Sequence, residues 1–194
     1  MDGGGPMIRE YLEWTKEVLG RIEPGEVQAL IDLLMDARKN GRGIFVIGNG
    51  GSAATASHFA VDLGKGTLRG TEDASRFRVN SLTDNLPYVT AWANDFDYDL
   101  VFEQQLRNLG APGDVVIGIS ASGNSPNVIR AMEFARSAGM ITVAVTGFSG
   151  GKLKEMADHS VHVPVDDYGM AENMHMIIVH IIITQTTSRI ADGE

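Results

Sequence analysis

The chain has 194 residues, of which 43% are apolar and 21% charged, a composition typical of a globular protein with one ordinary domain. Its formal net charge of −9 argues against general affinity for nucleic acids or anionic membranes, so we expect neither as a partner. The absence of cysteine excludes disulfides, thiolate metal ligands and a cysteine nucleophile, and it fits a reducing, cytoplasmic location.

The first part of the chain predicts two helices and then a buried strand. Residues 1–6 lack the basic and apolar pattern of a signal peptide, and we expect a flexible tail there. Apolar residues at helical spacing predict two helices within 7–40, separated at Pro24-Gly25. Their broad apolar faces suit core packing and also a subunit interface. The apolar run 44–47 predicts a buried parallel strand, followed by a helix over 53–63.

The turn between that strand and that helix, residues 48–52 (Gly-Asn-Gly-Gly-Ser), has the composition of an anion site. It has few bulky side chains, so backbone N–H groups can approach a ligand closely. The unpaired N–H groups and the dipole of the following helix point towards the same place.

The remainder alternates strands with helices. Loops are expected at 64–67 and 70–73, a strand at 77–82, a helix at 86–93, a polar turn at Asn94-Asp95 and a helix at 99–109. Further strands are expected at 115–119, 141–147 and 161–165, and further helices at 126–138, 152–157 and 171–189. The alternation predicts an α/β fold: a doubly wound parallel sheet of about five strands with helices on both faces. We expect one domain over 7–194.

A second candidate anion site follows the strand at 115–119. Its turn places Ser120, Ser122 and Ser125 before a helix that opens with Pro126. Hydroxyls and backbone N–H groups suit a phosphate monoester without arginine. Neither turn has the Gly-Lys-Ser/Thr ending, which excludes a Walker-type turn, and the Gly-x-Gly-x-x-Gly fingerprint is absent too, which disfavours a dinucleotide.

Histidines and carboxylates on two helices form the other candidate constellation. His58 and Asp62 lie four residues apart on one helix, and Glu172 and His180 share a broad face of the last helix. Such a set could hold zinc or another divalent ion, or supply a general acid and base. His175 reads as a hydrogen-bonded core residue, whereas His159 and His162 read as ordinary surface residues.

The ordered motifs resemble those of one family over nearly the whole chain. They are 48–52 with His58-Phe59, Ala93-Asn94-Asp95, the turn 119–125 and the closing Glu172…His180. Together they resemble the phosphoheptose isomerases, sugar-isomerase (SIS) domain proteins that convert sedoheptulose 7-phosphate to D-glycero-D-manno-heptose 7-phosphate.

This resemblance implies a homotetramer with active sites at subunit interfaces and a cis-enediol reaction, with Asp62 as base and His180 as acid. We expect His180 to come from a neighbouring subunit. The implied substrate-binding residues are Asn49, Gly50, Gly51, Ser52, Asp62, Asn94, Asp95, Ser120, Ala121, Ser122, Ser125 and Glu172. Some members carry zinc on residues that align with His58, Asp62, Glu172 and His180, so we expect Zn²⁺ or another divalent cation.

Two departures from the family pattern leave alternatives open. Asp62 stands where the family has glutamate, and Glu172 where it has glutamine. A base displaced by roughly 1 Å can lose about a hundredfold in rate unless the backbone shifts. The alternatives are an isomerase of another sugar phosphate, or a non-enzymatic SIS protein that binds the bacterial replication initiator protein. A sugar-phosphate-sensing regulatory domain ranks last, because only about 40 residues precede the first strand.

Overall fold

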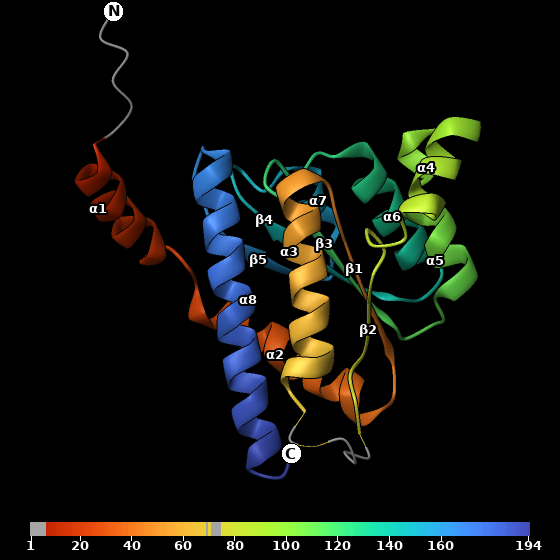
Figure 1. Cartoon of the computed structure of the whole chain (residues 1–194), viewed down its shortest axis with the longest axis horizontal. Helices are drawn as coiled ribbons and strands as arrows, with labels where there is room; N and C mark the ends of the chain where they lie inside the picture. The colour runs from red at the N-terminus through yellow and green to blue at the C-terminus, as the bar shows by residue number, and fades with distance from the viewer. Residues whose placement is uncertain (1–6, 69, 71–74) are drawn as a thin grey trace, which may run out of the picture.

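The computed structural model describes residues 7–68, 70 and 75–194, and within them the chain forms a five-stranded parallel sheet (Figure 1). The strand order is β2-β1-β3-β4-β5. Strand β2 therefore lies on one side of β1, and β3, β4 and β5 follow on the other side. The α/β fold class expected from the sequence is confirmed. The predicted tail 1–6 lies outside the described residues. The strands are β1 (Gly43–Gly48), β2 (Arg78–Ser81), β3 (Val115–Ser120), β4 (Ile141–Thr146) and β5 (His159–His162).

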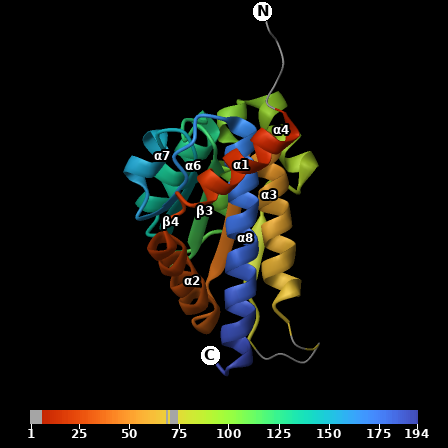
Figure 2. The same ribbon diagram turned by 90° about the vertical axis from the view of Figure 1, so that its left-hand side faces the viewer.

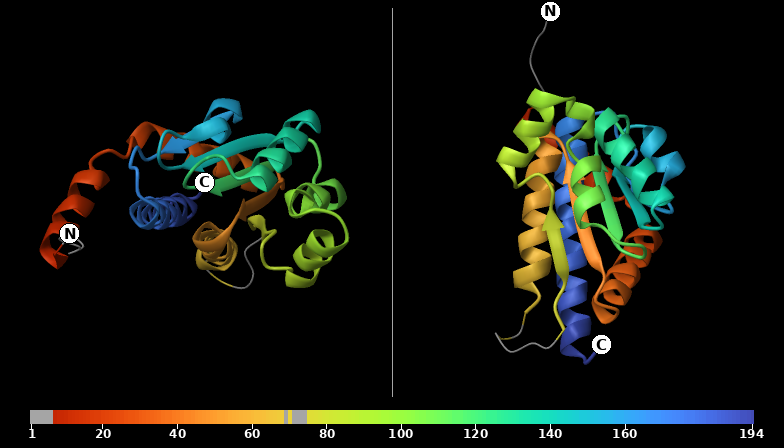
Figure 3. Two further views of the ribbon diagram at one scale, coloured as in Figure 1. Left: turned by 90° about the horizontal axis from the view of Figure 1, so that it is seen from above. Right: turned by 90° about the vertical axis from the view of Figure 1, so that its right-hand side faces the viewer.

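Helices cover both faces of the sheet, as the view from above shows (Figure 3). The first face carries α2, α3 and α8, and the second carries α5, α6 and α7. The helices are α1 (Ile8–Leu19), α2 (Pro24–Lys39), α3 (Gly50–Val61), α4 (Leu86–Asp95), α5 (Glu103–Leu109), α6 (Pro126–Ser137), α7 (Gly151–Met156) and α8 (Tyr168–Ala191). A π-helical turn spans Asp62–Gly66, and a 3₁₀ turn spans Tyr98–Leu100.

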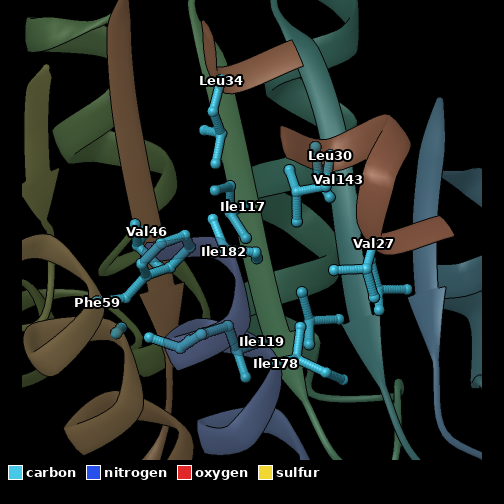
Figure 4. Packing of buried hydrophobic residues seen from close by; sticks show 14 of the residues in the cluster. Val27, Leu30, Leu34, Val46, Phe59, Ile117, Ile119, Val143, Ile178 and Ile182 are labelled. Carbon is cyan, nitrogen blue, oxygen red and sulfur yellow. The ribbon is translucent and has the colours of Figure 1, made fainter. Parts of the chain in front are cut away.

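The sheet is buried because its strands present apolar side chains to both faces. In β1, Ile44 and Val46 join the cluster on the first face, whereas Phe45 and Ile47 join the cluster on the second. Figure 4 shows Val46 packed close to Phe59 of α3. The apolar runs that predicted buried parallel strands therefore form the core.

Two helices, α3 and α8, begin three residues earlier than the sequence predicts. The glycines that suggested a turn after β1 belong to the first turn of α3, which starts at Gly50 and not at residue 53. At α8, the side chain of Asp167 accepts a hydrogen bond of 2.8 Å from the N–H of Met170, so the helix starts at Tyr168 and not at residue 171.

Other local expectations need correction. Asn94 and Asp95 close α4 and do not form a separate turn. The single helix expected at 99–109 is split, because the side chain of Asp97 accepts from the N–H of Asp99 and starts a short 3₁₀ turn. Strand β5 ends before Pro164, which has no N–H for further pairing. The loop expected at 64–67 is mostly π-helical, and residues 71–73 lie outside the described residues.

The helices α3 and α8 run side by side in the same direction and form the outer layer of one face (Figures 1 and 2). The helix α1 lies across the outer side of α8, away from the sheet. None of the helices in the described ranges is long and apolar enough to span a membrane. The pair α3–α8 and the carboxyl ends of β1 and β3 position the candidate site.

Candidate active site

The two predicted anion turns lie next to each other, because β1 and β3 are neighbours in the sheet. Residues of β1 from Ile44 to Gly48 pair in parallel with Val115 to Ile119 of β3. The chain then enters α3 through Asn49 and enters α6 through residues 121–125. Sheet order reverses between β1 and β3, and ligands of open parallel sheets bind at such a point.

The serine turn after β3 is a compact loop closed by its own hydrogen bonds. The hydroxyl oxygens of Ser120 and Ser125 lie 3.2 Å apart, and the N–H of Gly123 donates to the Ser120 hydroxyl at 3.2 Å. Gly123 has a φ of 66°, and a Cβ there would overlap the carbonyl oxygen of Gly150. Glycine is therefore required at 123, and the loop is held against the connection that follows β4.

The start of α8 lies against both turns. The N–H of Gly147 donates to the carbonyl of Ala121 at 2.9 Å, and Gly147 also contacts Ala171 of α8. A Cβ at Gly51 would overlap the carboxyl group of Glu172, so glycine leaves room for that carboxylate beside the start of α3. Glu172 thus lies beside the start of α3, at the carboxyl edge of the sheet.

Asn49, a predicted substrate contact, is held by two residues that the sequence did not single out. Its side-chain amide exchanges hydrogen bonds of 2.8 and 2.9 Å with the amide of Asn127 on α6. The hydroxyl of Tyr98 donates to the same Asn49 oxygen at 2.9 Å. Tyr98 closely follows Asn94 and Asp95, two exposed polar residues joined by a 2.8 Å hydrogen bond. The hydrogen bonds of Asn49 therefore link the turn after β1 to α6, which follows the serine turn, and to Tyr98, which follows the predicted sugar-binding pair.

One cluster of chemically reactive side chains lies further along α3 and α8. The Nε2 atoms of His58 and His180 lie 3.0 Å apart. The Asp62 carboxylate oxygen Oδ2 lies 3.1 Å from His58 Nε2 and 3.9 Å from His180 Nε2. Asp62 is also the first residue of the π-helical turn, a feature that is frequent at functional sites. The cluster brings together an acceptor carboxylate and two imidazoles that can donate or accept a proton.

The cluster contradicts one expectation from the sequence, and it does not include one of the four predicted metal ligands. His180 reaches His58 and Asp62 from the same chain, because α8 packs along α3, so a neighbouring subunit is not needed to supply it. Glu172 lies eight residues before His180, about 12 Å along the helix axis. In the part of the chain that the structure describes, the grouped metal-ligand side chains are His58, Asp62 and His180, without Glu172.

Comparison with known proteins places this chain in a family. A family model described as the SIS domain matches residues 10–147. The probable phosphoheptose isomerase of Thermoplasma acidophilum is 38% identical over 90% of this chain and 94% of its own length. The phosphoheptose isomerase of Mycobacterium tuberculosis is 42% identical over 87% of this chain and 84% of its own length. The chain belongs to the phosphoheptose isomerase family.

Solved structures of the phosphoheptose isomerase family have the same fold. The phosphoheptose isomerase of Neisseria gonorrhoeae superposes with a TM-score of 0.82 at 33% identity. The match covers 90% of this chain and 91% of that one. That of Francisella tularensis gives a TM-score of 0.86 at 27% identity, with 93% of this chain and 96% of the other covered. The similarity therefore extends over nearly the whole length of these phosphoheptose isomerases.

The donor set of this phosphoheptose isomerase family member fits a divalent metal ion. Two atoms that each lie about 2.1 Å from a shared tetrahedral ion are about 3.4 Å apart. The three distances within the cluster, 3.0, 3.1 and 3.9 Å, bracket that separation. Two imidazoles and one carboxylate also match the three protein ligands of catalytic zinc sites.

The other histidines of this phosphoheptose isomerase family member lie apart from the cluster. His175 is fully buried on α8, as expected, but neither ring nitrogen has a hydrogen-bond partner among the described residues, so the expected hydrogen bond is not found. His159 is exposed at the start of β5. His162 is partly buried, with its Nδ1 3.1 Å from the Thr146 hydroxyl, so it is not an ordinary surface residue.

Proposed function

We propose that the protein is a phosphoheptose isomerase that converts sedoheptulose 7-phosphate to D-glycero-D-manno-heptose 7-phosphate. The observation that carries the proposal is the convergence of Asp62 Oδ2 and His180 Nε2 within 3.9 Å, from two helices that begin beside the anion turns. An aldose–ketose isomerase needs a base, an acid and a site for the phosphate. Membership of the phosphoheptose isomerase family supports the same reaction.

The phosphate is bound by the serine turn. Ser122 and Ser125 are partly exposed, and their hydroxyls can donate to phosphate oxygens next to the N–H groups at the start of α6. This is how an acidic protein binds an anion locally. Asn49 and the Gly50-Gly51-Ser52 segment contact the sugar chain from α3, Asn94 and Asp95 bind sugar hydroxyls from α4, and Ala121 completes the phosphate turn.

Asp62 and His180 move the protons. The Asp62 carboxylate removes a proton from C1 of the ketose while His180 Nε2–H protonates the carbonyl oxygen at C2, which gives the cis-enediol. Asp62 then returns its proton to C2, and His180 takes the proton from the C1 hydroxyl, which leaves the aldehyde. His58 Nε2 lies 3.1 Å from Asp62 Oδ2 and 3.0 Å from His180 Nε2, so His58 holds a place beside both groups.

A divalent cation, Zn²⁺ as the first candidate, is part of the proposal. His58, Asp62 and His180 would hold it, because their donor atoms all lie within 4.8 Å of one another. Nε2 of each histidine would then bear the ion in place of a proton, so the proton-transfer role of His180 Nε2–H belongs to the metal-free site. When bound, such an ion polarises a carbonyl or hydroxyl oxygen of the substrate. It also offsets the negative charge of Asp62.

Removal of the metal is expected to lower turnover reversibly. The purified protein, as isolated and after chelation, is incubated with sedoheptulose 7-phosphate, and aldose formation is followed by NMR with bound metal measured in the same sample. We expect conversion to fall on chelation and to return with Zn²⁺, because the ion contributes several kcal/mol of charge stabilisation. Full activity after complete removal of the metal contradicts the metal proposal. No conversion by the metal-loaded protein contradicts the heptose assignment and points to another sugar phosphate.

A homotetramer with active sites at subunit interfaces is the second part of the proposal. The side chains of His58, Asp62 and His180 are 42%, 34% and 54% exposed in the single chain. Exposed apolar residues lie beside them, Val61 next to Asp62 and Ile181 next to His180. The amphipathic helix α1 also exposes Ile8 and Leu12, 83% and 56%. A partner subunit would bury these residues and close the site.

This assembly predicts a solution mass four times that of the chain. Light scattering after size-exclusion chromatography measures that mass directly. Ile8→Lys with Leu12→Lys should reduce the mass, because each charge would otherwise be buried in the interface. Glu17→Lys, a charge change at a side chain that is 66% exposed and lies on the opposite side of α1 from Ile8, serves as the control. A monomeric wild-type protein contradicts the proposal.

The domain limits 7–194 and the cytoplasmic location stay predictions. The SIS family match spans 10–147, and the remaining helix α8 packs on the same face of the sheet, which supports one domain. Absence of cysteine supports a reducing compartment.

A further inference from the structure

We propose that Asn127 and Tyr98 are positioning residues that hold the Asn49 amide so that it meets the substrate only as a hydrogen-bond donor. The proposal rests on the proposed function in one respect, that Asn49 contacts the sugar phosphate. The three residues come from three segments: Asn49 follows β1, Tyr98 follows α4, and Asn127 is the second residue of α6.

The orientation of the Asn127 amide is determined by the backbone. Its Oδ1 accepts a hydrogen bond of 2.9 Å from the N–H of Val128, and a backbone N–H can only donate. The atom facing Val128 is therefore the oxygen, and the Asn127 nitrogen must face Asn49. Asn127 is 1% exposed, so this arrangement is fixed inside the protein and Asn127 acts through Asn49.

The orientation of Asn49 follows from that of Asn127. Its Oδ1 accepts from Asn127 Nδ2 at 2.9 Å, and its Nδ2 donates to Asn127 Oδ1 at 2.8 Å. The hydroxyl of Tyr98 donates to the same Asn49 oxygen at 2.9 Å. A carbonyl oxygen has two lone pairs, and both are now used. One N–H of Asn49 remains for a ligand, so Asn49 can donate to a hydroxyl or phosphate oxygen.

The same contacts connect the parts of the site. Asn127 lies two residues after Ser125 of the phosphate turn, and Tyr98 lies three residues after Asp95 of the sugar-binding pair. Asn49 itself opens α3, which leads to His58 and Asp62. A change at Asn127 would therefore alter how the substrate is held without touching the groups that move protons.

Asn127→Asp tests the proposal with almost no change in shape. The new oxygen would face Asn49 Oδ1, and these two acceptors repel each other. Turning the Asn49 amide over would only bring its oxygen against the other carboxylate oxygen, so the pair separates and the Asn49 amide loses its fixed orientation. We expect KM for sedoheptulose 7-phosphate to rise about 10- to 100-fold, because one hydrogen bond to a charged or polar ligand is lost. The change in kcat should be much smaller. Tyr98→Phe leaves the Asn127 contacts and should raise KM about two- to tenfold.

Controls separate positioning from folding and charge. Asn40→Asp adds the same charge at the end of α2, next to the amino end of β1 and so at the opposite edge of the sheet, and should leave KM unchanged. Asn49→Ala removes the positioned group. In that background Asn127→Asp should have little further effect on KM, because the two residues act as a unit. Additive effects in this double-mutant cycle would overturn the proposal.

A readout in the free protein keeps this test separate from the proposed function. Side-chain amide NMR of wild-type Asn49 should show slow hydrogen exchange, and Asn127→Asp should abolish that protection. Sedoheptulose 7-phosphate should shift the wild-type Asn49 amide resonance. Fast exchange in the wild type overturns the positioning by Asn127. If exchange is slow but the substrate causes no shift, the positioning of Asn49 by Asn127 is supported. The same result overturns the role of Asn49 as a donor to this sugar and counts against the proposed function.

Discussion

His180→Gln is expected to lower kcat for sedoheptulose 7-phosphate by about 10²- to 10⁴-fold, the usual contribution of a general acid. Glutamine keeps a polar side chain of similar reach but cannot exchange a proton near neutral pH. Binding of the sugar phosphate should persist, because the serine turn and Asn49 lie at the carboxyl edge of the sheet. Steady-state kinetics and calorimetric binding of the substrate measure the two quantities separately.

Asp62→Asn should cause a loss of similar size, because an amide cannot accept the proton from carbon. The double variant should be little worse than either single variant, since base and acid act as one unit. His159→Gln is the matched control, because it makes the same chemical change on an exposed histidine at the start of β5. Turnover that survives His180→Gln within tenfold of the wild type would remove His180 from the role of acid.

The fold was predictable from the sequence because its signals are local. Runs such as Ile44–Ile47 and Val115–Ile119 are apolar on both alternating faces, which fits a strand buried on both sides. The ends of helices were less predictable. A glycine pair after Asn49 favours a turn by propensity, yet it opens α3, and a Cβ at Gly51 would overlap the carboxyl group of Glu172 on α8. Asp167 could have been recognised as a cap, because Asp is a strong N-cap residue.

The site was predictable only where its members share one helix. His58 and Asp62 lie four residues apart, so their proximity follows from helix geometry. The contact of His180 with them depends on how α8 packs on α3, and spacing along the chain cannot reveal that. Asn127 did leave a signal: it lies four and eight residues before Ala131 and Ala135, on the buried stripe of α6. An amide in such a stripe needs a partner.

His175 is expected to make the protein less stable in acid. It is fully buried on α8, and neither ring nitrogen has a hydrogen-bond partner among the described residues. Burial disfavours the charged imidazolium and lowers the pKa of His175 to about 4. The backbone of Thr146 favours the charged form slightly but offers no hydrogen bond of normal geometry. His162, also partly buried, disfavours a second positive charge nearby.

The direction of the effect follows from proton uptake. Between the ordinary pKa of 6.5 and about 4, the unfolded chain binds a proton at His175 and the folded chain does not. The free energy of unfolding therefore falls as the pH drops through this range, by up to about 3 kcal/mol from this group. Above pH 6.5 the contribution is constant. Burial lowers the pKa of His162 as well, so that residue adds a change in the same direction.

His175→Leu isolates the contribution of His175. Leucine fills the apolar site without a nitrogen that must lose its hydration, so stability near neutral pH should stay equal or rise. The loss between pH 6.5 and 4 should shrink by up to about 3 kcal/mol, and the slope that remains reports His162 and the carboxylates. Urea unfolding at a series of pH values measures this, with His159→Leu, an exposed histidine, as the control. If the wild-type and His175→Leu profiles run parallel from pH 7 to 4, then His175 is charged in the folded protein, and its environment must supply a partner for the imidazolium.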